Sequence, residues 1–111
     1  MQERIERIKK FLEEKKAEDV QIFDLKDKGY FVDTVIIATS LGDKHTAALL
    51  DYLKEKLKPL GEEFLKIDES DEWIVIDLGD ILIHIMTEAY RKKYNIEEFL
   101  EAIKEGREIK E

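Results

Sequence analysis

The sequence predicts a single α+β domain in which helices pack against a mixed five-stranded sheet. The chain has 111 residues, of which 43% are apolar, enough for one hydrophobic core and too few for two. Stretches with apolar residues at three- and four-residue spacing, typical of helices, alternate with β-branched runs, typical of strands. Two such runs flank Gly79-Asp80, a pair typical of a β-hairpin loop. We therefore expect residues 1–111 to form one domain.

The first half of the chain is predicted to contain two helices and two strands. Apolar residues at helical spacing predict an amphipathic helix over about residues 2–16. A short strand is expected over 20–25. The run 34–39 has no polar alternation, which predicts an inner strand buried on both faces. Asp43 is expected to cap the second helix, which ends near Pro59.

The second half is predicted to contribute three strands and two helices. A strand is expected near residues 63–67, followed by the hairpin 73–86. Two short helices are then expected over about residues 87–105. The second of these should begin after Asn95, which forms the pattern of a capping box with Glu98.

The hairpin register follows if Leu78 pairs with Ile81, because side chains alternate between the two faces of a strand. One face, expected to join the core, then carries Ile74, Ile76, Leu78, Ile81, Ile83 and Ile85. The other face carries the cross-strand pairs Trp73 with Met86, Val75 with His84, and Asp77 with Leu82. This second face is apolar but includes an indole, an imidazole and a carboxylate.

Acidic side chains are concentrated in the second half of the chain. Residues 62–111 hold 7 basic and 15 acidic side chains, a net charge of −8 that equals the charge of the whole chain. Such a surface repels phosphate, so we expect a basic protein partner and no sequence-specific nucleic acid. The absence of cysteine excludes disulfides and cysteine-bound metals. No stretch is apolar enough to cross a membrane or direct secretion, which predicts a cytoplasmic protein with no membrane partner.

The sequence predicts no catalytic residue, no metal site and no cofactor. Ser40, Asp43 and His45 are the residue types of a nucleophilic triad, but no Gly-x-Ser-x-Gly turn is present, and a strand-to-helix turn accounts for them better. His45 and His84 lack the spacing of metal ligands, and His84 is expected to be a partly buried structural histidine. The glycines are isolated, so no glycine-rich phosphate loop is expected.

Trp73 has two interpretations. A tryptophan at the end of a strand is either a residue at the rim of the core or an anchor that another protein covers. Trp, Tyr, Arg and Met are over-represented at protein interfaces, and Trp73, Met86, Arg91 and Tyr94 follow one another along the hairpin and the next helix. This grouping favours a docking face.

The hairpin also resembles the signature of a known family, the ribosomal silencing factors, also called Iojap or RsfS proteins. The resemblance rests on Trp73, on Asp77-Leu78-Gly79-Asp80 and on the apolar run that contains His84. Further similar motifs are found at residues 16–25 and 33–39, and downstream at Arg91, Tyr94 and Ile96-Glu97. Two positions depart from the family: Ser40-Leu41-Gly42 differs from the usual turn, and Leu100 stands where many members have tryptophan.

The resemblance implies a fold related to nucleotidyltransferases without their metal-binding Gly-Ser and Asp-x-Asp motifs. It also implies a function: binding to the large ribosomal subunit through ribosomal protein L14 and steric blocking of small-subunit joining. The expected partner-binding residues are Trp73, Asp77, Leu78, Asp80, His84, Met86, Arg91 and Tyr94. The alternatives are a metal-dependent nucleotide-handling enzyme of the same fold and a homodimerisation module that uses the Trp73 face.

Overall fold

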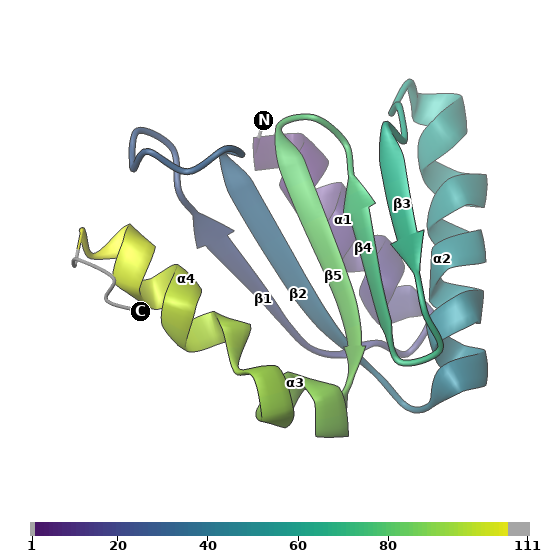
Figure 1. Cartoon of the computed structure of the whole chain (residues 1–111). Helices are drawn as coiled ribbons and strands as arrows, with labels where there is room; N and C mark the ends of the chain where they lie inside the picture. The colour runs from purple at the N-terminus through teal and green to yellow at the C-terminus, as the bar shows by residue number, and fades with distance from the viewer. Residues whose placement is uncertain (1, 107–111) are drawn as a thin grey trace.

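A computed structural model describes residues 2–106, and its elements follow the predicted order (Figure 1). The helices of the first half are α1 (Gln2–Glu14) and α2 (Asp43–Leu57), and α2 continues into the 3₁₀ turn η1 (Lys58–Leu60). The strands are β1 (Glu18–Asp24), β2 (Thr34–Ser40), β3 (Lys66–Glu69), β4 (Trp73–Asp77) and β5 (Ile81–Thr87). The chain then forms α3 (Glu88–Tyr94) and α4 (Ile96–Lys104).

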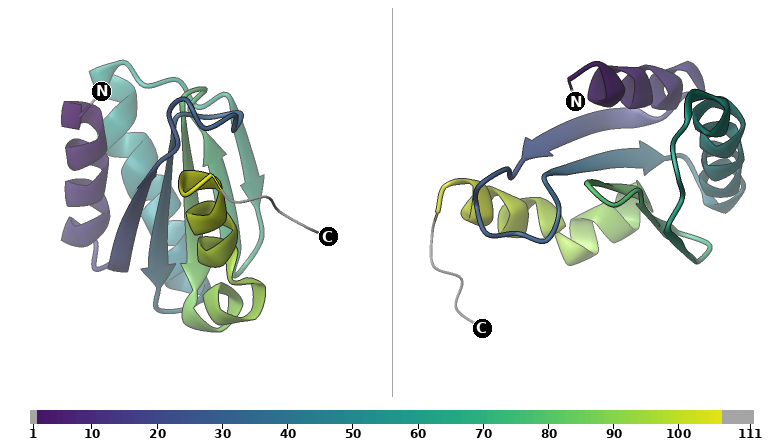
Figure 2. Two further views of the ribbon diagram at one scale, coloured as in Figure 1. Left: turned by 90° about the vertical axis from the view of Figure 1, so that its left-hand side faces the viewer. Right: turned by 90° about the horizontal axis from the view of Figure 1, so that it is seen from above.

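The five strands form one mixed sheet in the order β1-β2-β5-β4-β3, which confirms the predicted fold class. β2 and β5 are parallel, whereas the other neighbouring strands are antiparallel. Figure 2 shows α1 and α2 on one side of the sheet and α3 and α4 on the other. None of the helices in the described part of the chain combines the length and the apolar character needed to cross a membrane.

β2 is the inner strand that its sequence predicts. All seven of its residues are buried, and it lies between β1 and β5. Parallel strands are joined by a long crossover, usually with a helix that packs on the sheet. They are therefore found where both faces of the sheet are covered. Here Ile36 and Ala38 face the core under α1 and α2, whereas Val35 and Ile37 face the cluster under α3 and α4.

The hairpin forms with the predicted register. Trp73 lies opposite Met86, Val75 opposite His84, and Asp77 opposite Leu82. The loop is closed by the Leu78 N–H, which donates to the Ile81 carbonyl at 2.9 Å. Gly79 has a φ of 99°, in the region that favours glycine. All six apolar residues assigned to the core face belong to the core cluster under α1 and α2.

The ends of several elements differ from the prediction. Asp43 is the first residue of α2 and not its cap; Gly42 occupies the cap position, and no side chain caps the helix there. The strand expected at 63–67 is found at Lys66–Glu69. The residues before it form a loop from η1, in which the Leu65 N–H donates to the Asp77 carbonyl at the end of β4.

The predicted capping box at the start of α4 does not form. Asn95 has a φ of 40°, in the left-handed region, and its side chain accepts no bond from the helix. Instead its Nδ2 donates to the Glu98 carboxylate at 2.9 Å. The left-handed residue turns the chain sharply between α3 and α4, so Asn95 serves as the end of one helix and the start of the next.

Candidate functional site

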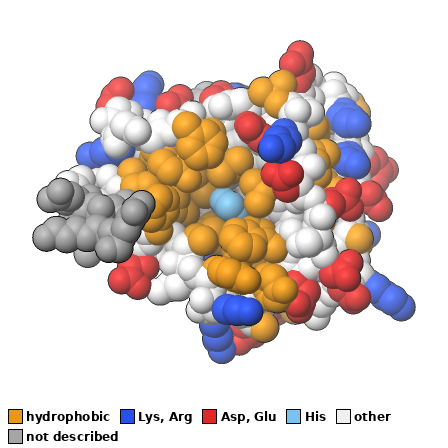
Figure 3. Space-filling model, in the orientation of Figure 1, with side chains coloured by type: hydrophobic (Ala, Val, Ile, Leu, Met, Phe, Trp, Pro, Cys, Tyr) orange, Lys and Arg blue, Asp and Glu red, His pale blue; other side chains and the backbone are white. Residues whose placement is uncertain are grey.

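Part of one face of the sheet is not covered by helices. In Figure 1, α3 and α4 lie over the β1 side and the lower end of the sheet, so no helix lies over much of β4 and β5 on this face; side chains bury Leu82 and Met86 there. The open face carries Trp73, Val75 and His84, all partly exposed. Figure 3 shows apolar side chains gathered around a histidine on this side of the molecule. We call Trp73, Val75, His84, Tyr90 and Tyr94 the aromatic face.

Trp73 is held in a defined orientation on the aromatic face. Its indole N–H donates to His84 Nδ1 at 3.0 Å. Its ring lies 5.1 Å from that of Tyr94 between centroids, at an angle of 39°. Tyr94 in turn contacts the ring of Tyr90 at 5.5 Å. Three aromatic rings and an imidazole therefore present a rigid, largely apolar surface to solvent.

His84 is the polar group that orients Trp73. Burial lowers the pKa of His84 to about 4, because the charged imidazolium loses its hydration there. The ring is therefore neutral at physiological pH, and its unprotonated Nδ1 accepts the indole bond while Nε2 bears the proton. The predicted structural role of His84 agrees with this position, and its ring edge is also part of the aromatic face.

A second group of exposed aromatic side chains continues beyond the aromatic face. Phe31, in the loop between β1 and β2, is 68% exposed and lies 4.6 Å from the Tyr30 ring. Tyr30 contacts Phe99 of α4 at 6.2 Å. We call Phe31, Tyr30 and Phe99 the aromatic wing. The aromatic wing was not predicted from the sequence, although Phe31 lies two residues after the turn residue Gly29, and a large apolar residue in a surface loop is the kind of feature that marks a binding surface.

Three of the expected partner-binding residues lie inside the protein: Leu78, Met86 and Arg91. Met86 is fully buried and Leu78 nearly so. Met86 belongs to the cluster against which Trp73 packs, and Leu78 faces the opposite core under α1 and α2. Leu78 and Met86 therefore support the hairpin from within.

Asp77 and Asp80 shape the hairpin loop, at the opposite end from Trp73. The Asp77 carboxylate accepts the Gly79 N–H at 2.8 Å. Asp80 pairs with Arg4 of α1 at 2.6 Å, and Arg4 also binds Glu62 at 2.8 Å. The Arg4 guanidinium lowers the pKa of the Asp80 carboxyl. Asp80 therefore connects the hairpin loop to α1 through its ion pair with Arg4.

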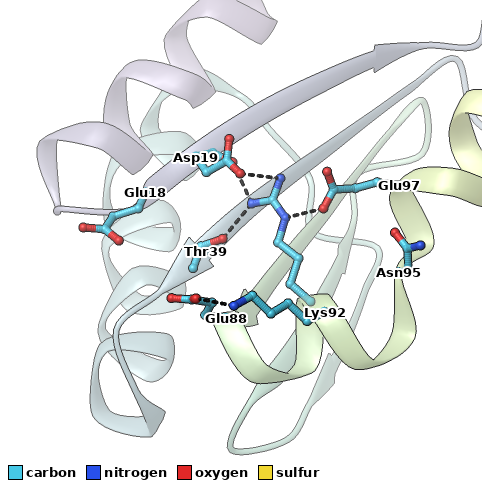
Figure 4. Close-up of a pocket in the computed structure, with 8 residues that line it drawn as sticks. Glu18, Asp19, Thr39, Glu88, Lys92, Asn95 and Glu97 are labelled. Atoms are coloured by element: carbon cyan, nitrogen blue, oxygen red, sulfur yellow. Dashed lines mark hydrogen bonds and ion pairs between the residues drawn. The ribbon is translucent and has the colours of Figure 1, made fainter.

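Arg91 is a buried structural residue at the junction of four elements. Its guanidinium lies beside a cavity of about 330 Å³, where Asp19, Thr39 and Glu97 converge on it (Figure 4). Its Nη1 donates to the Asp19 carbonyl and to Thr39 Oγ1, both at 2.6 Å, and its Nε donates to Glu97 at 2.7 Å. Only 6% of its surface is exposed. Arg91 thus ties α3 and α4 to β1 and β2.

The three residues of the apparent triad bind other groups and not one another. The Asp43 carboxylate accepts the Lys44 N–H at 2.8 Å. Ser40 Oγ lies 2.6 Å from Thr46 Oγ1. His45 Nδ1 accepts the Leu41 N–H at 2.8 Å, and its Nε2 lies 2.6 Å from the Lys15 carbonyl. His45 therefore fastens the turn before α2 to the end of α1. Within residues 2–106, no three His, Asp or Glu side chains come together as a group able to hold a metal ion.

We expect Arg91→Met to lower the free energy of unfolding by about 3 kcal/mol, because it leaves Glu97 and the Thr39 hydroxyl without their shared partner. Asp19→Asn is the control, since it keeps the main-chain carbonyl that accepts from Arg91 and removes only the ion pair of Arg91 Nη2 with the exposed Asp19 carboxylate at 3.5 Å; it should cost less than about 1 kcal/mol. Urea denaturation measures both. Equal losses in the two variants would contradict a structural role for Arg91.

We expect the stability of the protein to fall as the pH falls from about 6.5 to about 4. In this range the unfolded chain takes up a proton on His84 that the folded chain, with its pKa of about 4, does not. The free energy of unfolding should fall by about 3 kcal/mol over this range. His84→Gln keeps an acceptor for Trp73 and should flatten this part of the pH profile. His45→Gln is the control and should leave it in place; parallel profiles for wild type and His84→Gln would contradict the assignment.

The comparisons with known proteins agree with the resemblance in the sequence. The family model described as "Ribosomal silencing factor during starvation" matches residues 1–111. A ribosomal silencing factor of Chromobacterium violaceum is 32% identical over 88 residues, 78% of this chain and 72% of that protein. A mouse protein named "Mitochondrial assembly of ribosomal large subunit protein 1" is 24% identical over 98 residues, 84% of this chain and 43% of that protein.

A crystal structure of a Chromobacterium violaceum protein has the same fold. It superposes with a TM-score of 0.84 at 28% sequence identity, and the match covers 99% of this chain and 89% of that one. A family model that spans the whole chain, together with this similarity in sequence and structure, decides the assignment. The chain belongs to the ribosomal silencing factor family, also known as RsfS or Iojap.

Proposed function

We propose that this protein binds the large ribosomal subunit through ribosomal protein L14 and blocks the joining of the small subunit. Membership of the ribosomal silencing factor family supports a ribosomal partner. The name of the mouse relative refers to the large ribosomal subunit. Occlusion requires a docking surface and no catalytic group, so the protein acts only while it is bound.

The observation that supports docking is the aromatic face around Trp73. Protein interfaces are built on a few aromatic anchors that are held rigidly before binding, because pre-ordered side chains lose little entropy on association. Trp73 meets this description, since His84 fixes its indole and Tyr94 packs against its ring. The partly exposed ring leaves apolar surface for a partner to cover.

The charge of the chain supports a basic partner. Residues 62–111, which include β3, β4 and β5, have a net charge of −8. Ribosomal proteins are typically basic, so the two surfaces attract one another. Complementary charge accelerates the encounter and sets its register, whereas the desolvated anchors determine how long the complex lasts.

Trp73→Ala should weaken binding to isolated large subunits by about 2 kcal/mol, or about thirtyfold, because it removes the central anchor. Co-sedimentation with large subunits over a range of concentrations measures the affinity, and small subunits should not sediment the protein.

Phe11→Ala is the matched control for Trp73→Ala. Phe11 is a partly buried aromatic residue of α1, on the side of the sheet opposite the aromatic face. Its truncation should reduce stability without changing the affinity of the folded molecules. Unchanged affinity in Trp73→Ala would contradict this docking mode. A wild-type protein that forms dimers, loses them on Trp73→Ala and does not bind ribosomal subunits would instead favour the homodimerisation module.

The protein should inhibit subunit joining in proportion to occupancy. In a light-scattering assay, large subunits loaded with increasing amounts of the protein should give decreasing amplitudes, reaching the minimum near one molecule per subunit. The physical reason is that a steric block acts once per site. Inhibition by far fewer molecules than subunits would indicate turnover, contradict occlusion and favour an enzyme.

A further inference from the structure

A small notch lies beside Trp73 on the open side of the β3–β4 hairpin. It has a volume of about 260 Å³ and is lined by Asp68, Glu69, Ser70, Trp73 and Val75. Sites for nucleotides and other small molecules usually enclose about 300–1,000 Å³. The notch is below this range and matches the size of a single inserted side chain.

The sheet register places an acid and an apolar residue side by side in the notch. Asp68 lies directly opposite Val75 in the β3–β4 ladder, and residues that oppose one another project from the same face. Val75 in turn lies opposite His84, which is bonded to Trp73. A carboxylate, an isopropyl group and an indole ring therefore adjoin one another on the open face.

The turn that closes the notch is held in place. The Ser70 hydroxyl donates to the Trp73 carbonyl at 2.7 Å, and the Ser70 N–H donates to the same oxygen at 3.2 Å. Trp73 is also fixed through its indole N–H. The walls of the notch are thus ordered before a partner arrives, which lowers the entropic cost of binding.

The charge around the notch is strongly negative. Residues 66–72 contain one basic and four acidic side chains. Asp68 faces Lys66 across 3.9 Å, and both side chains are well exposed. An exposed pair at this distance contributes little, so a cation from a partner can replace Lys66 at small cost.

We propose that this notch binds one lysine or arginine side chain from the surface of the protein partner. The aliphatic stem lies along Val75 and the Trp73 ring, while the cationic head pairs with Asp68. Such side chains bury their methylene groups and keep the charged end at a polar rim, and an indole ring also attracts a cation. The proposal rests on the proposed function, because it requires the aromatic face to dock on a protein.

The test compares two substitutions that each remove one negative charge. Asp68→Asn alters the notch, whereas Asp51→Asn alters an exposed residue of α2, on the opposite side of the sheet. Binding of wild type and both variants to isolated large subunits is measured by co-sedimentation at several salt concentrations, with Trp73→Ala alongside. Circular dichroism confirms that each variant is folded.

We expect Asp68→Asn to weaken binding about five- to tenfold at low salt, and the difference to shrink as salt screens the pair. Asp51→Asn should stay within about twofold of wild type. Val75→Phe, which fills the notch, should weaken binding as Asp68→Asn does. The double variant Asp68→Asn/Val75→Phe should bind no more weakly than whichever of its two single variants binds more weakly, because both changes remove the same contact.

The outcomes separate the two proposals. If Trp73→Ala binds much more weakly than wild type, but Asp68→Asn binds as tightly as Asp51→Asn, the notch assignment is overturned and the docking face stands. If wild type does not bind large subunits, the proposed function fails and the notch assignment fails with it. A loss in Asp68→Asn that is equally large at high salt would also overturn the proposed ion pair.

Discussion

The parallel pairing of β2 with β5 is the constraint on which the rest of the structure depends. Because both strands are largely buried on both faces, the sheet needs helices on each side, and α2 is part of the crossover that connects the two strands. Helices α1 and α2 cover one face, whereas α3 and α4 cover only part of the other (Figure 2). No helix lies over much of β4 and β5 on that face, and this is where the aromatic face is found.

The position of the open surface is set by a few polar contacts. Arg91 holds α3 and α4 against β1 and β2, on the side of the sheet away from β4. Leu100 of α4, which stands where the sequence resemblance leads us to expect tryptophan, is buried in the same cluster as Met86.

Most of the fold could be predicted because it depends on local patterns. The hairpin register followed from alternation and a two-residue loop, and β2 from an uninterrupted β-branched run. Boundaries were less accurate where backbone geometry decided them. Lys16 with a φ of 70° ends the first helical segment two residues early, and Asn95 with a φ of 40° replaces a capping box by a sharp turn. Such left-handed residues are poorly predicted from residue type when they are not glycine.

By itself the sequence determined the fold class and the side of the hairpin that faces outward, since periodicity of 2 or 3.6 residues specifies which side chains share a face. The resemblance of its motifs indicated the family. Only the tertiary structure decided which of those residues reach solvent. Met86 and Arg91 belong to the same motifs as Trp73 and Tyr94, but they are buried by segments distant in the chain, whereas Phe31 is exposed next to Tyr30. Burial depends on the packing of the whole chain, and no local pattern contains that information.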